Sequence, residues 1–488
     1  MRNLKDPDVL GNRNVSASNN FELYIILQFE PPATKLFNMT RKRQNSATIL
    51  WLLPVLMIYL DSCTASSGPN NWPQFRGPAA DMIVTGDNLP TEWGEDLNVA
   101  WTFDLEGDSW ASPVVWGNRV FVTSTVAEKI TKPAEGEESS SEENQDLYLQ
   151  DIYRWEVTCV DLNTGEELWK KVAREGSPRT KKHPNTNYAG ESPVTDGERL
   201  YVYFGMNGVY CFDMDGGLIW EKDLGAYETQ NGWGTGASPL LYKGTLYVQV
   251  DNEVNSFLVA LDAETGKEIW RVDRDEKTSY TTPYIWKNSN GTELVTGGKT
   301  ARSYDPATGE LIWELRMNGV YSIPSPVSDD DHLFMGNAGD QKVTSTFFAV
   351  KAGAEGDITP DSGQFTSSGV AWSNLDAPLG NPSPLLYKGL LYLFASRGGE
   401  ITCMEAETGE IVYQEKVENV AACWASPWAN GDRIYFLDEK GVTRAVKAGR
   451  KFELLGESRL DDRFWASVAV AGDAYLFKGD KKLYCIKK

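Results

Sequence analysis

Histidine is nearly absent from this sequence of 488 residues, and its scarcity excludes several kinds of catalytic site. With only His183 and His332 present, a metal centre built from several imidazoles is excluded, and a Ser-His-Asp triad has few possible arrangements. No two cysteines are adjacent, and neither a Cys-x-x-Cys pair nor a haem-attachment motif occurs. A glycine-rich phosphate loop between a strand and a helix is also missing. We therefore predict no catalytic residue and no metal ligand.

Positive charge is also scarce, because 47 lysines and arginines face 69 acidic residues, for a formal net charge of −22. Such a surface repels nucleic acids and anionic lipids, so nucleic acid is not expected as a partner. The acidic stretch at residues 127–150 lacks the alternating ligands and the fixed glycine of a calcium loop. We interpret it as a solvated insertion.

No apolar run is long enough for a comfortable membrane span. The apolar residues 47–60 follow the basic residues 41–43, which is the order of a secretory signal. We therefore predict a signal peptide at residues 39–62, with Met39 as the true start and residues 1–38 as a non-native extension. A signal anchor with a cytoplasmic amino-terminal tail is the alternative.

The residues that follow the predicted signal allow two processing routes. Residues 60–63 resemble a bacterial lipoprotein signal with Cys63 as the lipidated residue, although Asp61 is atypical; cleavage among residues 65–67 is the alternative. We predict a protein of the periplasm or a membrane-anchored lipoprotein, with no membrane contact beyond that anchor. Four further cysteines occupy one repeated strand position that requires a small buried side chain, and we expect no disulfide among them: Cys159, Cys211, Cys403 and Cys485.

Two interleaved repeats determine the fold. An Asp-turn that leads to a tryptophan ends at residues 169, 220, 270 and 313, with a weaker copy ending at Tyr413. A Ser-Pro or similar opening starts an apolar strand at eight positions: Ser112, Ser192, Ser238, Thr282, Ser325, Ser383, Ser426 and Ser467. Repeats of this length with four strands each are typical of propellers. We predict an all-β, eight-bladed β-propeller of four-stranded antiparallel blades at residues 96–488, preceded by a tether and lead-in at residues 63–95.

The ends of the chain fit eight blades of four strands each. The last unit has only three strands, and one additional strand, around Trp101, precedes the first opening. We predict that this amino-terminal strand completes the last blade and closes the ring. A β-sandwich or an open array is the alternative. The large aromatics of the outer strands are expected to pack between blades.

The longer connections between strands should gather on one face of such a ring, and function is usually carried by longer loops. Seven aromatic residues precede the strand openings and should surround the channel mouth: Trp110, Tyr188, Trp233, Tyr280, Tyr321, Trp424 and Trp465. Nearby polar groups are predicted from His183, Asp251, Asn252 and Arg274. These residues form either a ligand-binding platform or the packing that plugs the channel.

The Asp-x-x-Thr-Gly-x-x-x-Trp turns and Ser-Pro strands resemble the pyrroloquinoline quinone (PQQ)-like β-propeller repeat family over residues 96–488. The overall plan is similar to that of outer-membrane assembly lipoproteins of the BamB family. The segments at residues 71–78 and 183–188 resemble a bacterial subgroup without assigned activity. The resemblance also extends to quinone dehydrogenases, which hold PQQ above the channel with calcium, a catalytic Asp and adjacent cysteines. This sequence has no adjacent cysteines.

These observations favour a non-catalytic scaffold that binds a protein or polymer at the bacterial cell envelope, as a monomer and without a cofactor. The alternative is a dehydrogenase-like protein that uses PQQ with calcium and acts on alcohols or sugars. A carbohydrate-binding or sugar-cleaving protein is a third hypothesis.

Overall fold

The computed structural model describes residues 71–129, 148–339, 345–377 and 379–488. The predicted extension, the signal peptide and Cys63 lie outside these residues, which all belong to the compact unit at residues 64–488. Over the described ranges, no helix has the length and apolar character needed to cross a membrane.

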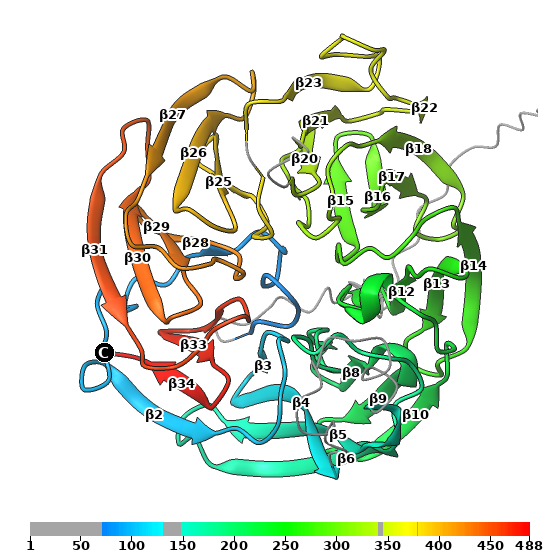
Figure 1. Cartoon of the computed structure of the whole chain (residues 1–488), viewed down its shortest axis with the longest axis vertical. Coiled ribbons are helices and arrows are strands. Elements are labelled where there is room, and N and C mark those ends of the chain that lie inside the picture. The colour runs from blue at the N-terminus through cyan, green and yellow to red at the C-terminus, as the bar shows by residue number, and fades with distance from the viewer. Residues whose placement is uncertain (1–70, 130–147, 340–344, 378) are drawn as a thin grey trace, which may run out of the picture. The chain divides into compact units, whose positions relative to one another are not determined.

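Eight sheets, each with four antiparallel strands, follow one another around a central channel, as predicted (Figure 1). Two of them gain a short fifth strand that pairs in parallel: β1 (Ile83–Val84) beside β28 (Trp428–Asn430) and β22 (Gly356–Asp357) beside β18 (Leu311–Arg316). Blades 1 and 2 contain β3 (Val114–Trp116), β4 (Arg119–Lys129), β5 (Ile152–Asp161), β6 (Glu167–Gly176), β7 (Val194–Thr195), β8 (Arg199–Tyr203), β9 (Val209–Asp213) and β10 (Leu218–Lys222). Blades 3 and 4 contain β11 (Leu240–Tyr242), β12 (Thr245–Val250), β13 (Ser256–Asp262), β14 (Glu268–Arg274), β15 (Tyr284–Asn288), β16 (Gly291–Thr296), β17 (Thr300–Tyr304) and β18 (Leu311–Arg316).

The second half of the ring repeats this order. Blades 5 and 6 contain β19 (Val327–Ser328), β20 (His332–Gly336), β21 (Phe347–Lys351), β23 (Val370–Asn374), β24 (Leu385–Tyr387), β25 (Leu390–Phe394), β26 (Glu400–Glu405) and β27 (Ile411–Lys416). Blades 7 and 8 contain β28 (Trp428–Asn430), β29 (Arg433–Leu437), β30 (Val442–Lys447), β31 (Leu454–Arg459), β32 (Ala469–Ala471), β33 (Ala474–Lys478) and β34 (Lys482–Ile486). Short 3-10 turns are η1 (Tyr148–Gln150), η2 (Gly205–Asn207) and η3 (Gln230–Gly232).

The predicted ring closure is confirmed by β2 (Val99–Asp104), which is the outer strand of the last blade. It pairs antiparallel with β34, and Trp101 lies opposite Cys485. Closure by an early strand removes an open edge from the terminal sheet and ties the two ends of the propeller together.

Outer-strand tryptophans join neighbouring blades. The indole N–H of Trp101 donates to the Leu162 carbonyl of blade 1 at 2.8 Å, and four more repeat this contact with the next blade: Trp169, Trp220, Trp270 and Trp372. Each indole also lies against the glycine of the adjacent Asp-turn, where a larger residue would collide with the ring. The predicted packing of these outer-strand tryptophans between blades is therefore observed. Trp313 differs, because its N–H bonds to Glu293 inside its own blade.

The cysteines of the described residues are free and buried, as expected. Burial raises the pKa of the Cys159, Cys211, Cys403 and Cys485 thiols to about 12. These thiols are therefore protonated and unreactive near neutral pH.

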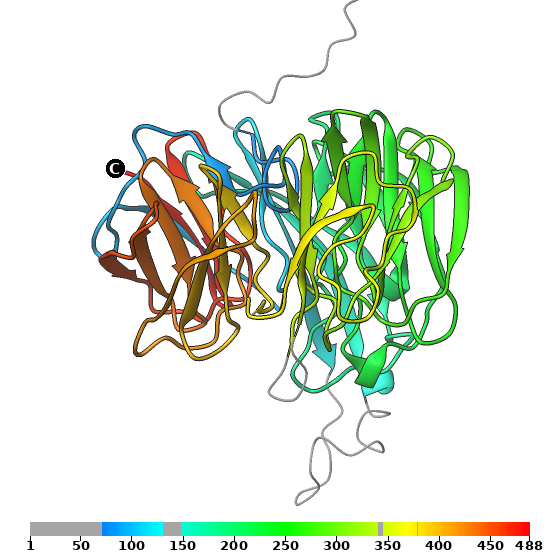
Figure 2. The ribbon, with the colours of Figure 1, turned by 90° about the horizontal axis from the view of Figure 1, so that it is seen from above.

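A lead-in segment (residues 71–95) crosses the centre of the ring before β2 (Figure 1). Trp72 exchanges backbone hydrogen bonds with Val115 in blade 1, and β1 (Ile83–Val84) then pairs in parallel with β28 of blade 7. Trp93 packs 5.4 Å from Phe477 in blade 8, measured between ring centroids. In Figure 2 the lead-in, drawn in blue, lies toward the upper face of the ring. These contacts tie the lead-in to blades 1, 7 and 8.

Candidate functional site

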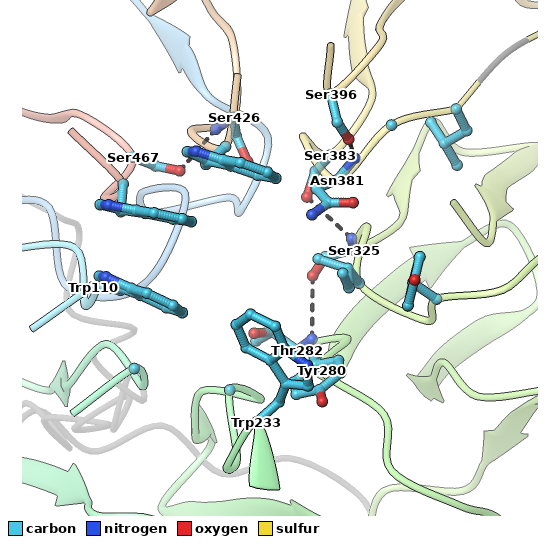
Figure 3. A pocket seen from close by; sticks show the side chains of 18 of the residues that line it. Trp110, Trp233, Tyr280, Thr282, Ser325, Asn381, Ser383, Ser396, Ser426 and Ser467 are labelled. Atoms are coloured by element: carbon cyan, nitrogen blue, oxygen red, sulfur yellow. Dashed lines mark hydrogen bonds between the residues drawn. The ribbon is translucent and has the colours of Figure 1, made fainter. Parts of the chain in front are cut away.

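A pocket of about 1370 Å³, here called the channel pocket, occupies the mouth of the central channel. Six of the seven predicted aromatics line it: Trp110, Trp233, Tyr280, Tyr321, Trp424 and Trp465. They come from the connections that precede the first strands of different blades, which brings residues far apart in the sequence together. Figure 3 shows Trp110, Trp233 and Tyr280 around this space.

A hydroxyl ring forms the base of the channel pocket. All eight Ser or Thr residues of the strand openings line it, although each is at most 9% exposed: Ser112, Ser192, Ser238, Thr282, Ser325, Ser383, Ser426 and Ser467. Six backbone N–H groups of the ring donate to the hydroxyl of the next blade at 2.9–3.2 Å (Figure 3). The ring holds the inner strands at a fixed spacing and satisfies buried N–H groups that have no other strand beside them.

The lead-in segment closes the channel beneath this ring. Phe75 lines the channel pocket, and the neighbouring Arg76 is 1% exposed. The Arg76 guanidinium donates to the Pro326 carbonyl at 2.7 Å and to the Pro384 carbonyl at 3.1 Å, in blades 5 and 6. Burial lowers the pKa of Arg76 to about 10, so the side chain remains charged at neutral pH. The pocket is therefore open at the mouth and closed at the base.

One wall of the channel pocket is a tryptophan stack from blades 1, 8 and 7. The Trp465 ring lies 4.3 Å from Trp110 and 4.8 Å from Trp424, with interplanar angles of 14° and 8°. Arg463 lies 4.9 Å from the Trp465 ring and Arg397 lies 5.2 Å from the Trp424 ring. Because the rings cover one another's faces, the stack is a rigid wall.

The opposite wall contains Trp233, which stacks on His183 at 4.1 Å and 15°. The backbone N–H of Asn185 donates to Nδ1 of His183, which places the imidazole proton on Nε2. Burial and the nearby Lys182 lower the pKa of His183, so the imidazole is neutral at neutral pH. His183 itself is not a lining residue; it supports one face of Trp233.

Asn187 and Glu191 provide buried polar groups in the same region. Asn187 lines the pocket and is 9% exposed, and its amide Nδ2 has no hydrogen-bond partner among the described residues. Its oxygen accepts the Ala189 backbone N–H at 2.9 Å. Glu191 lies behind the lining residue Thr235, whose hydroxyl donates to it, and burial raises the pKa of Glu191 to about 7.

The structure places four predicted residues away from the channel pocket. Tyr188 packs between blades, with its ring centroid 5.3 Å from that of Tyr153. Asp251 and Arg274 form an ion pair at 2.9 Å with fully buried side chains. Asn252 accepts and donates hydrogen bonds within its own loop. These polar groups are used inside the fold, which corrects their expected position at the mouth.

Several lining residues were not anticipated. Phe75, Arg397 and Arg463 reach the channel pocket from the lead-in segment and from two loops. The hydroxyl ring was visible in the sequence as the repeated strand opening, but we assigned it only a strand-starting role. The charged residues that line the pocket are Asp376, Arg397, Glu400, Glu439 and Arg463.

Comparisons with known proteins agree with this architecture. Residues 154–301 match a family model described as outer membrane protein assembly factor BamB. The matched residues therefore support PQQ-like repeats, and the whole described chain has the propeller fold. A region of 147 residues is 28% identical to quinohemoprotein alcohol dehydrogenase ADH-IIG of Pseudomonas putida, and it covers 27% of this chain and 19% of that relative.

Solved structures show the same fold for this PQQ-like propeller. BamB from Moraxella catarrhalis superposes with a TM-score of 0.52 at 11% identity, covering 79% of this chain and 99% of the other. Quinohemoprotein alcohol dehydrogenase from Comamonas testosteroni superposes with a TM-score of 0.55 at 13% identity, covering 88% and 82%. At such identities the likeness is one of fold alone.

Two features of the described residues bear on the metal-bound quinone that such dehydrogenases hold. Within the described residues, no group of three or more His, Cys, Asp and Glu side chains lies close enough to hold a metal ion. The described cysteines are buried in separate blades and cannot form an adjacent pair against a cofactor. The described part of the chain therefore lacks both an adjacent cysteine pair and a cluster of three His, Cys, Asp or Glu ligands.

Proposed function

We propose that this PQQ-like propeller is an exported, non-catalytic binding protein that holds an extended polymer in its channel pocket. The observation that carries the proposal is the closed base of the pocket. The lead-in segment and the hydroxyl ring make a rigid floor, and the loops of eight blades make a wall rich in aromatic and amide side chains. A rigid, concave and partly apolar surface of this kind is typical of ligand-binding sites.

The residue types in the pocket support binding over catalysis. Neither histidine nor cysteine is among its lining residues, so a Ser-His or Cys-His nucleophile pair is not available there. Of the lining carboxylates, Glu439 accepts the indole N–H of Trp424 at 2.9 Å and so positions the tryptophan stack. The six aromatics and the hydroxyl ring recognise a ligand without acting on it.

The expected location at the cell envelope rests on other residues. The basic and apolar run at residues 41–60 has the order of an export signal. The family model matched by blades 1–4 belongs to an outer-membrane assembly factor. An envelope polymer or protein is therefore the proposed class of partner, reached by a soluble or lipid-anchored monomer.

A quinone-dependent dehydrogenase is the second candidate, favoured by the 28% identity to a quinohemoprotein alcohol dehydrogenase. One experiment separates the two. Purified protein is titrated with PQQ in the presence of Ca²⁺, followed by absorbance and by dye-linked oxidation of alcohols and sugars. The same protein is titrated with soluble glycans and with extended peptides. We expect no stoichiometric absorbance change and saturable binding of a polymer. Quinone uptake with substrate oxidation would overturn the proposal.

A further inference from the structure

We infer that the polymer held by the channel pocket is a neutral saccharide chain. The inference rests on the proposed binding function and assigns the ligand class for that same site. It depends on exposed aromatic faces, an unpaired amide group and the balance of charge among the lining residues.

The aromatic faces that remain available lie opposite the tryptophan stack. His183 covers one face of Trp233, and neither Tyr280 nor Tyr321 has a ring partner among the described residues. Figure 3 shows Trp233 and Tyr280 directed into the same space. The C–H faces of pyranose rings are apolar and flat, and they pack on such rings. Burial raises the pKa of Tyr280, so its hydroxyl keeps the proton that it donates.

The polar lining suits hydroxyl groups. Amide side chains surround the aromatics: Asn185, Asn187, Gln230, Asn231, Asn381 and Gln414. Amides donate and accept at once, as sugar hydroxyls do. Asn187 is one of these lining residues, and its buried Nδ2 has no hydrogen-bond partner within the described structure. A buried donor without a partner costs about 1–3 kcal/mol, which a bound hydroxyl would remove.

The charges of the lining residues argue against an acidic polymer, and the hydrogen bonds of the backbone argue against an extended peptide. Two arginines and three carboxylates line the pocket of a chain with a net charge of −22, which disfavours an acidic ligand. An extended peptide would pair with free N–H groups on the inner strands. At six of the eight strand openings, directly before the inner strands, the backbone N–H already donates to the hydroxyl ring.

The size of the pocket indicates more than one sugar ring. Its volume of about 1370 Å³ exceeds the roughly 300–1,000 Å³ that is usual for a single drug-sized ligand. The pocket is closed at the base by Phe75 and Arg76, so a chain would enter and leave through the mouth.

The test uses the full exported protein and an array of soluble hexasaccharides, followed by calorimetry. Neutral gluco-, manno- and xylo-hexasaccharides are compared with uronate hexasaccharides and with extended peptides. We expect saturable binding of at least one neutral hexasaccharide. Trp233→Ala should weaken it about tenfold, Asn187→Ala about fivefold, and Trp233→Phe less than Trp233→Ala. Tyr280→Ala should weaken binding, whereas Tyr242→Ala, at a β11 position outside the pocket, should not.

Each result decides between the alternatives, provided that circular dichroism shows a folded variant. Failure of every neutral sugar to bind overturns the saccharide inference. Binding of uronates or peptides that is lost in Trp233→Ala also overturns it, while the proposed binding function survives. Sugar binding that is unchanged in Trp233→Ala and in Tyr280→Ala places the site elsewhere and overturns both.

Discussion

Replacing Glu191 by glutamine should change how the stability of the propeller depends on pH. Glu191 is 2% exposed, and its carboxylate accepts a hydrogen bond from the Thr235 hydroxyl. Burial raises the pKa of this carboxyl from 4.5 to about 7, although hydrogen bonds from Thr235 and from the local backbone oppose the rise. The buried side chain is therefore neutral in mild acid and becomes charged as the pH passes neutrality.

The sign follows from proton linkage. Because the folded-state pKa is above the unfolded-state value, Glu191 contributes stability that is fully present below about pH 4.5 and is lost as the pH rises through about 7. The two pKa values differ by about 2.5, and each pKa unit corresponds to about 1.36 kcal/mol, so the group can change the free energy of unfolding by about 3 kcal/mol. Between about pH 5 and about pH 8.5 the loss through this group is about 2.5 kcal/mol.

Glutamine has the same shape and no charge, so it removes this dependence. Urea unfolding followed by tryptophan fluorescence gives the free energy of unfolding of both proteins at the two pH values. The Glu191→Gln variant should match the wild type near pH 5 and exceed its stability by about 2.5 kcal/mol near pH 8.5. Glu407→Gln, at an exposed turn, is the matched control and should change neither value. If the free energy of unfolding changes with pH by the same amount in the wild type and in Glu191→Gln, the reasoning is wrong.

Two further predictions concern the parts of the chain that close the fold. Trp101→Ala removes the inter-blade indole contact of the closing strand and should lower the free energy of unfolding by about 3–5 kcal/mol. Thermal unfolding measures this loss, with the exposed Leu168→Ala as the control. A loss as small as that of the control would contradict the prediction. Gly77→Ala should lower the free energy of unfolding by about 1–3 kcal/mol, because Gly77 has a φ of 88° and an added methyl would lie 2.8 Å from the Trp72 ring. An unchanged melting temperature would show that the lead-in contributes no stability.

The blade architecture could be predicted because each blade repeats the same local chemistry. The Asp-turn, its glycine and the tryptophan recur in register, and five of the indoles make the same bond to the next blade. Position within the repeat also predicted the channel mouth, since residues just before each strand opening reach the same face. Six aromatics at that position line the pocket.

The remaining errors come from contacts between residues far apart in the sequence. Asp251 is predicted as a loop carboxylate available to a ligand, but Arg274 reaches it from the end of β14, and both charges are buried. Tyr188 also precedes a strand opening, as the lining aromatics do, yet its ring packs against Tyr153 and Trp155. No local sequence pattern indicates either contact, the ion pair of Asp251 or the ring packing of Tyr188. Phe75 belongs to the lead-in, and its place in the channel pocket depends on where that segment crosses the ring.

Ring closure and pocket closure depend on one continuous part of the chain. Trp72 bonds to blade 1, Arg76 bonds to blades 5 and 6, and β1 pairs with blade 7 before β2 completes blade 8. A segment that joins both the inner strands and the last outer strand links the shape of the pocket floor to the closure of the ring. The pocket is therefore rigid because its floor belongs to the element that holds the propeller together. Rigid sites lose little conformational entropy on binding, which suits the proposed recognition of a flexible polymer by its ring faces and hydroxyl groups.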